Sequence, residues 1–216
     1  MNRQVKSLPL KQVREIFVVL RNLETMAQEL GRDVERGSRE LSANCDDQFL
    51  RRSQVRIFAA FVEGFSFLLK QVVLRLHDPL QTQLSIDELS KLKEIELDAV
   101  GQPVLDKQHV PKRRFLRFHD NFKFTGVVFG RLCGSNYAMS YGSAGHQAFT
   151  RTLLVRDRLM HPKTIEGLSL TNSETMDLQN AWQWYQSEIV ALMKDSAVAM
   201  NARFAVILQA DSRGQS

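Results

Sequence analysis

Hydrophobic residues near the start of the chain recur at alternating steps of three and four. Such spacing gathers apolar side chains into one stripe along a helix. The stripe spans about three heptads, which suits either a short coiled coil or one bundle helix packed along its neighbours. Gly37 and Ser38 then mark a predicted break. The stripe contains Val13, Ile16, Leu20, Leu23, Ala27, Leu30 and Val34.

A second helix is expected over about residues 49–77, where apolar residues occupy nearly every side. A helix of this kind belongs at the centre of a fold. Asp78 and Pro79 are expected to end it, because proline lacks the N–H that a continuing helix needs. Its apolar residues include Ile57, Phe58, Phe61, Val62, Phe65, Leu69, Val72 and Val73.

The middle of the chain predicts shorter elements. Ser85 and Glu88 have the spacing of a capping box, which opens a short helix over about 86–93. Two stretches, 94–97 and 104–107, flank a glycine-containing turn and predict a two-stranded hairpin. We therefore expect a small irregular or hairpin insertion between helices.

Three more helices complete the predicted set. Phenylalanine and valine residues between Phe115 and Leu132 predict the first, which Gly134 ends. The second covers about 146–160. The third covers about 173–210 and begins with a capping-box pattern.

The predicted fold class is an all-α helical bundle. Residues 1–48 would form an N-terminal helical extension, 49–210 the bundle and 211–216 a disordered tail. Of the 216 residues, 44% are hydrophobic and 25% are charged, the composition of a soluble globular protein. Cys45 and Cys133 are too few for a disulfide framework, and no segment reaches the roughly 20 apolar residues of a spanning helix. We expect a cytoplasmic protein.

The charge balance makes a polyanionic partner plausible. The chain has 29 Lys and Arg against 24 Asp and Glu, a net charge of +5. Arg113, Arg114 and Arg117 interleave with Phe115 and Phe118, which is typical of an RNA-contacting patch. The alternative, which charge patterning favours, is a solvated rim at the start of a helix.

The stretch 151–163, R-T-L-L-V-R-D-R-L-M-H-P-K, carries the main candidate chemistry. On a helical wheel Arg156 falls among the apolar residues, whereas Arg151 and Arg158 fall on the opposite side. A guanidinium on an apolar face is costly unless it meets an anion, because it cannot lose its proton. Arg156 therefore requires a partner.

His161 is expected at the end of this helix, because Pro162 disfavours helical geometry at the preceding residue. The helix dipole there favours the charged imidazolium. Arg156 lies about 7 to 8 Å away along the helix axis, so both side chains could serve one phosphodiester, with Asp157 orienting either of them. The alternative is structural: Arg156 pairs with a buried acid such as Glu63, and His161 caps carbonyls.

The sequence R-D-R-L-M-H-P-K resembles the signature of the HEPN superfamily, the helical domains named for higher eukaryotic and prokaryotic nucleotide binding. Their motif is Arg, then usually Asn, Asp or His, and a His after four to six intervening residues. Arg156, Asp157 and His161 fill it here with four between, and Pro162-Lys163 continues as in many members. The resemblance extends over roughly residues 49–210.

This resemblance implies a homodimer in which two motifs face one cleft and cleave RNA without metal, through a 2′,3′-cyclic phosphate. Arg156 would bind the phosphate, His161 would transfer protons, Asp157 would position them, and Lys163 would contact RNA. Members act as toxins, phage-defence effectors or RNA processors, some with an antitoxin or sensor protein as partner. Others have lost catalysis and serve as scaffolds.

Three functions remain open at this point. The first is a metal-independent endoribonuclease that needs no cofactor. The second is a non-catalytic dimeric module that binds RNA, a nucleotide or a protein partner. The third is a structural bundle in which Arg156 is satisfied internally.

Overall fold

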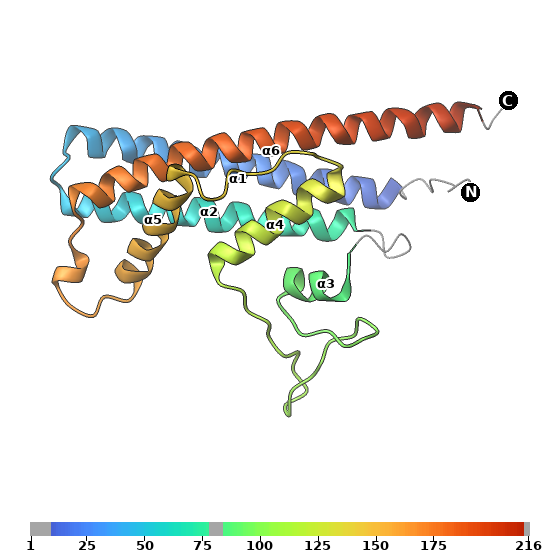
Figure 1. Cartoon of the computed structure of the whole chain (residues 1–216), viewed down its shortest axis with the longest axis horizontal. Helices are drawn as coiled ribbons and strands as arrows, with labels where there is room; N and C mark the ends of the chain where they lie inside the picture. Colours follow the sequence, from blue (N-terminus) through green and yellow to red (C-terminus); the bar gives the residue numbers. More distant parts are fainter. Residues whose placement is uncertain (1–9, 78–83, 214–216) are drawn as a thin grey trace. The chain divides into compact units, whose positions relative to one another are not determined.

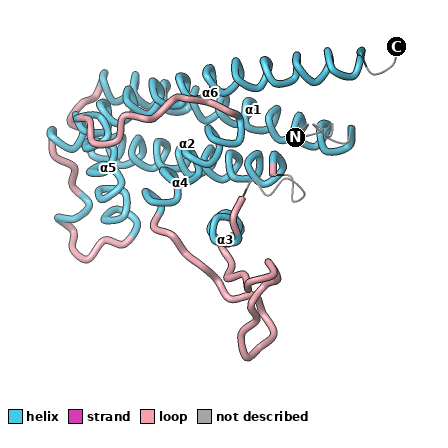
Figure 2. Tube along the Cα trace, turned by 45° about the vertical axis from the view of Figure 1, so that its right-hand side comes forward, coloured by secondary structure: helices cyan, strands magenta, loops and turns pink. Residues whose placement is uncertain are grey.

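The computed structural model describes residues 10–77 and 84–213 (Figure 1). It is helical over 73% of the chain, and the described residues form no β-strand (Figure 2). The predicted all-α bundle is therefore confirmed. Its elements are α1 Leu10–Ala43, α2 Gln48–Leu76, α3 Ile86–Lys93, α4 Phe118–Cys133, α5 Ala144–Met160, the 3-10 turn η2 Glu166–Leu168 and α6 Asn172–Arg213.

The end of α1 differs from the prediction. The helix continues through Gly37 and Ser38 to Ala43. Gly37 is a packing residue, because a Cβ there would lie 1.9 Å from the amide oxygen of Gln54 on α2. The glycine thus permits the close approach of two helices and does not break α1.

Other helix ends agree with the expected signals. The Ser85 hydroxyl accepts from the Glu88 N–H, and the Glu88 carboxylate accepts from the Ser85 N–H, so this capping box is formed. The same reciprocal pair forms between Thr171 and Glu174 before α6. The predicted stop at Asp78 and Pro79 lies outside the described residues.

The C-terminal helix extends beyond the predicted range. α6 reaches Arg213, three residues into the segment expected to be a disordered tail. Residues 214–216 lie outside the described part of the chain.

The chain divides into two compact units. Each of the helices α1, α2 and α6 has one part in unit 1 and the other part in unit 2. Unit 1 contains Met1–Arg21, Leu68–Tyr137 and Lys194–Ser216, and unit 2 contains Asn22–Phe67 and Ala138–Met193.

The core of unit 2 is a cluster of aromatic rings from three helices. Phe58 of α2 is fully buried and meets Phe149 of α5 and Tyr185 of α6 edge to face, with ring centroids 6.1 and 6.4 Å apart. Phe61 and Phe65 extend the cluster along α2. Edge-to-face packing of this kind stabilises beyond the burial of area alone. It joins α2, α5 and α6 into one framework.

α2 is as apolar as the sequence indicates. Among the described residues it is the one helix long and apolar enough to cross a membrane by length and composition. Most of its apolar window is buried inside the protein, as in the core helix of a soluble protein.

In unit 1 the insertion between α3 and α4 is an arm of three extended segments rather than a two-stranded hairpin (Figure 1). Leu97 pairs with Pro103, as expected for the first turn. Leu105 then pairs with Pro111, and Ile95 with Arg113, so a third segment closes the arrangement. Because this third segment is extended, α4 begins at Phe118 and not at Phe115 as predicted.

The three segments are joined by a closed ring of backbone hydrogen bonds. The Glu96 N–H donates to the Lys112 carbonyl at 2.8 Å, the Val104 N–H to that of Glu96 at 2.9 Å, and the Lys112 N–H to that of Val104 at 2.8 Å. These residues are eight positions apart, and the two connecting loops share the pattern L-D-x-x-[G/H]-x-P. The arm therefore contains an eight-residue unit used twice, followed by a third extended segment.

Each connecting loop is folded by its aspartate. Asp98 Oδ1 accepts from the N–H groups of Val100 and Gln102, and Asp106 Oδ1 accepts from those of Gln108 and Val110. A left-handed residue follows in each loop, Gly101 with φ 81° and His109 with φ 60°. These bonds fold the backbone locally, as is typical of Asx turns.

The ring predicts slow amide hydrogen exchange at Glu96, Val104 and Lys112, because each N–H donates to a neighbouring segment. Exchange at the loop tips, Ala99 and Lys107, should be fast. NMR-detected exchange checks this, and Val104→Pro, which removes one ring donor, should remove protection at all three positions. Equally fast exchange at the ring and the tips would contradict the arrangement.

Candidate functional site

α5 positions the motif, and both of its ends follow local sequence signals. The Ser143 hydroxyl accepts from the His146 N–H at 3.2 Å and starts the helix. The helix ends at Met160, and His161 is its C-cap, with φ −132° and ψ 60°. The predicted end before Pro162 is confirmed, and the His161 side chain is exposed there.

The wheel position predicted for Arg156 is also confirmed. The buried face of α5 contains Ala148, Phe149, Thr152, Val155 and Leu159. Arg156 lies on this face and is 29% exposed. Arg151 and Arg158 lie on the other side, where they form ion pairs with Asp177 at 2.6 Å and Glu174 at 2.8 Å of α6.

Two carboxylates hold the Arg156 guanidinium. Its Nη2 donates to the Glu63 carboxylate of α2, and its Nη1 donates to Asp157 Oδ1 at 2.8 Å. Glu63 is the internal acid that the structural alternative named. The cluster keeps some contact with solvent, since the Glu63 and Asp157 side chains are 37% and 62% exposed. An incoming phosphate would have to compete with these two acids for the guanidinium.

His161 follows α5 as its C-cap and is exposed. Five residues along a helix correspond to a rotation of about 140° relative to Arg156. In the described part of the chain no hydrogen bond or ion pair joins His161 to Arg156. The structure therefore brings Arg156, Asp157 and Glu63 together within one chain, and it does not add the imidazole to that cluster.

The loop after α5, which carries Lys163, is fixed to α2. Gln48 donates to the Leu170 carbonyl at 2.9 Å and accepts from the Leu170 N–H at 2.8 Å. Arg51 is 5% exposed and donates to the same carbonyl and to Asn172 Oδ1. No sequence pattern indicates this role of Arg51, which stands between Leu50 and Arg52. Lys163 itself is exposed.

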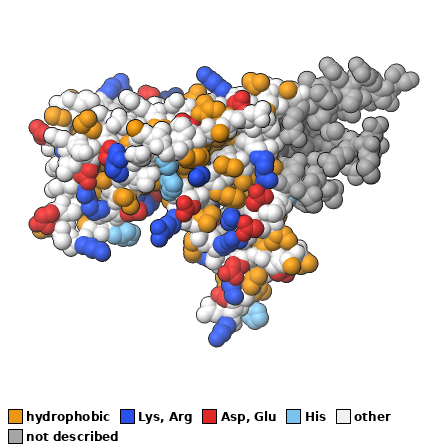
Figure 3. Space-filling view, in the orientation of Figure 1, with side chains coloured by type: hydrophobic (Ala, Val, Ile, Leu, Met, Phe, Trp, Pro, Cys, Tyr) orange, Lys and Arg blue, Asp and Glu red, His pale blue; other side chains and the backbone are white. Residues whose placement is uncertain are grey.

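The three arginines predicted to contact RNA lie in unit 1 and differ in their surroundings. Arg114 donates to Asp87 at 2.7 Å and to Ser90 at 3.1 Å, so it fixes the arm to α3. Arg113 lies over the Phe115 ring, 5.7 Å from its centroid, and Arg117 is exposed at the start of α4. Acidic, basic and apolar side chains are intermixed on the arm (Figure 3). Arg113 and Arg117 thus remain open to a ligand, whereas Arg114 is engaged.

The two acids of α6 that pair with arginines of α5, Glu174 and Asp177, have lowered pKa values. The pKa of Asp177 is lowered chiefly by the hydrogen bond from Arg151. Burial raises the pKa of Glu174, but hydrogen bonds from Arg158 and from the Thr171 N–H outweigh it, so the net shift is downward. Both carboxylates are therefore held in their charged form and keep α5 attached to α6.

The residues that the structure describes contain no cluster of metal ligands. No three His, Cys, Asp or Glu side chains there gather in a way that could hold an ion. Cys45 is exposed and Cys133 is buried.

No known protein family, curated protein or solved structure matches the chain.

The paired acids predict how stability depends on pH. Because the pKa of Asp177 is lowered in the folded protein, its stabilising effect is present above the unfolded value of about 3.9 and is lost as pH falls through the folded pKa. Arg151→Gln removes the main cause of the shift. As pH falls from 7 to 2, the unfolding temperature should therefore decrease less for this variant than for the wild type. An identical decrease in both proteins would contradict the assignment.

Proposed function

We propose that the chain is a metal-independent endoribonuclease of HEPN type that cleaves RNA by attack of the 2′-hydroxyl. One observation supports this most: Arg156 is held half-exposed at the end of α5, beside Asp157, on the helix that ends at an exposed His161. The residues of the motif are thus accessible and are carried by a rigid element. Proteins place reactive groups in such positions when geometry must be maintained.

The proposed reaction needs only side-chain chemistry. Arg156 binds the phosphate and stabilises the charge that develops on it. The ribose 2′-oxygen bonds to phosphorus as the bond to the 5′-oxygen breaks, which leaves a 2′,3′-cyclic phosphate and a 5′-hydroxyl. His161 takes the proton that the 2′-hydroxyl loses and gives a proton to the departing 5′-oxygen, and Glu63 and Asp157 orient the guanidinium.

The proposed site is shared by two copies of the chain. Among the described residues no hydrogen bond or ion pair joins Arg156 to His161 of the same chain, so a second copy would bring an imidazole to the cluster. Three large apolar side chains flank the motif and are exposed: Leu154 by 65%, Met160 by 52% and Ile165 by 82%. Exposed apolar groups gathered around a polar site favour contact with a partner.

The remaining roles are proposals of the same kind. Lys163, Arg113 and Arg117 would contact the RNA backbone, since phosphate contacts supply much of the affinity for nucleic acid. The protein would act in the cytoplasm as a toxin or phage-defence effector, with an antitoxin or sensor protein as a possible partner.

The test is cleavage of labelled RNA in the presence of a metal chelator. The wild type should cut, and His161→Ala should be slower by about 100-fold or more, the range for losing a general acid or base. Arg156→Ala should lose activity as well, whereas Arg151→Ala on the other face of α5 should retain it. DNA and 2′-O-methyl RNA should stay intact, because both lack the attacking hydroxyl. Undiminished cleavage by His161→Ala would refute the proposal.

A non-catalytic dimeric module that binds RNA, a nucleotide or a protein partner is the second candidate. It is favoured by the ion pairs of Arg156, because two carboxylates already neutralise the guanidinium. In this case RNA should remain uncut at every protein concentration, and Arg156→Ala should lose binding only. Gel-shift and cleavage assays on one RNA distinguish the two candidates.

A further inference from the structure

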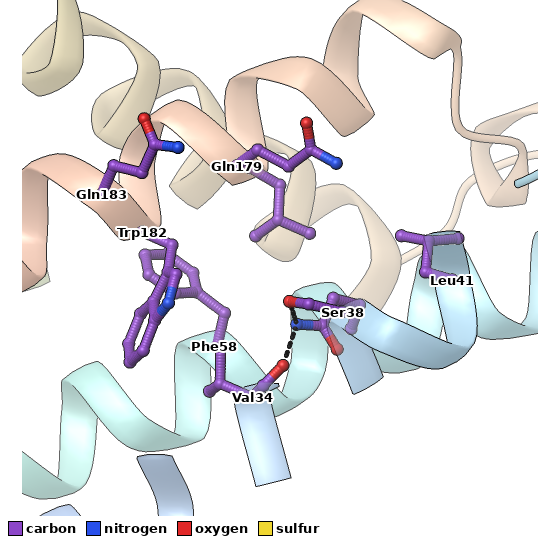
Figure 4. A pocket seen from close by; sticks show the side chains of 9 residues that line it. Val34, Ser38, Leu41, Phe58, Gln179, Trp182 and Gln183 are labelled. Atoms are coloured by element: carbon purple, nitrogen blue, oxygen red, sulfur yellow. Dashed lines mark hydrogen bonds between the residues drawn. The ribbon is translucent and has the colours of Figure 1, made fainter. Parts of the chain in front are cut away.

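A cavity of about 200 Å³ lies in unit 2 between α1, α2 and α6 (Figure 4). No charged side chain lines it. Its polar groups come from Ser38, Gln54, Gln179 and Gln183, and its aromatic groups are Phe58 and Trp182. It shares no residue with the Arg156 cluster, so it is a separate candidate site.

Three of the four polar side chains that line the cavity are amides, which both donate and accept hydrogen bonds. Gln54 is 3% exposed, and its Nε2 donates to the Val34 carbonyl and to the Ser38 hydroxyl, each at 2.8 Å. Its Oε1 is buried and has no hydrogen-bond partner in the described structure. Gln179 and Gln183 project from α6 at the rim (Figure 4). The cavity thus offers both kinds of neutral hydrogen-bonding group.

Aromatic rings form one side of the cavity. Phe58 is fully buried and meets Trp182 edge to face, with ring centroids 6.2 Å apart. Trp182 is only half-buried, and its indole extends from α6 beside Phe58 (Figure 4). An indole in this setting can stack with a planar ring.

The absence of charge limits the ligand. Every exposed residue of α6 from Asn172 to Val190 is uncharged, and the acids Glu174, Asp177 and Glu188 of this segment are engaged elsewhere. A phosphate or carboxylate would find no counter-charge in the cavity. The volume is below the roughly 300 Å³ at which sites for drug-sized ligands begin. The occupant is therefore a small, neutral ring system with its own donors and acceptors.

We propose that this cavity binds an unpaired nucleobase. Gln amides pair with the edges of bases, and unstacked bases lie on aromatic side chains in protein complexes with RNA. The base would lie against Trp182, with its edge toward Gln179 and Gln183. The source is either a free nucleoside or one base of an RNA strand.

A neighbouring cavity allows an experiment to distinguish a free nucleoside from a base within an RNA strand. It has a volume of about 360 Å³, is also lined by Trp182, and carries Arg32 and Glu35 among its lining residues. Arg32 also pairs with Glu29 at 2.7 Å, so a phosphate would compete with this carboxylate for the guanidinium. A ribose-phosphate chain that continues from the bound base would enter it and meet this guanidinium. A free nucleoside has no phosphate to reach Arg32.

The experiment follows the indole N–H signals of the full chain by NMR. The chain has two tryptophans, so Trp182→Phe assigns both signals. Adenosine, guanosine, cytidine and uridine are titrated, and then a single-stranded RNA of six nucleotides. The signal of Trp182 should shift saturably with at least one nucleoside or with the RNA, and that of Trp184 should shift less.

Calorimetry with the same ligand then tests the amides. The double variant Gln179→Leu, Gln183→Leu should weaken binding by about tenfold or more, the effect of losing one to two hydrogen bonds. Asn180→Leu, which is also exposed on α6 and lines neither cavity, is the matched control, with affinity unchanged. Arg32→Gln should weaken binding of the RNA but not of the nucleoside.

Each result decides the proposal. Saturable binding that depends on Gln179 and Gln183 supports it, and the response to Arg32→Gln identifies the source. No shift of Trp182 with any of these ligands up to about 10 mM would overturn it, as would binding that the double variant leaves intact. Neither outcome bears on RNA cleavage, which uses other residues.

Discussion

The ion pair between Arg156 of α5 and Glu63 of α2 is the interaction on which this account depends. It places a permanent positive charge on the apolar face of a helix, where the charge needs a partner. Glu63 and Asp157 together supply that partner and leave the guanidinium half-exposed. If the protein cleaves RNA, this ion pair orients the arginine toward the phosphate. If the protein is a scaffold, the same ion pair is a structural contact between α5 and α2.

The distribution of charge in unit 2 follows from how α5 and α6 are joined. The arginines of α5 pair with acids on α6 or α2, which keeps these acids away from the exposed surface of α6. The surface that remains is neutral and rich in amides, beside Trp182. Two chemically different regions therefore arise in one unit: a charged cluster at the end of α5, and an uncharged cavity between α1, α2 and α6.

The sequence predicts what local periodicity and capping determine. The apolar character of α2, the capping box of Ser85 and the end of α5 before Pro162 are all confirmed. Even the Glu63 partner of Arg156 was among the stated alternatives. The helix break predicted at Gly37 was wrong, because this glycine allows close contact with Gln54 on another helix. The ring in the arm and the buried Arg51 depend on pairings between distant residues, which helix patterns do not encode.

The most direct test of the central claim is a double-mutant cycle on RNA affinity with Glu63→Gln and Arg156→Gln. If Glu63 orients Arg156 for phosphate, Glu63→Gln changes affinity in the wild-type background and has no further effect once Arg156 is replaced. The coupling free energy should then be about 1 kcal/mol. Strictly additive effects, or an affinity that neither substitution alters, would contradict the account.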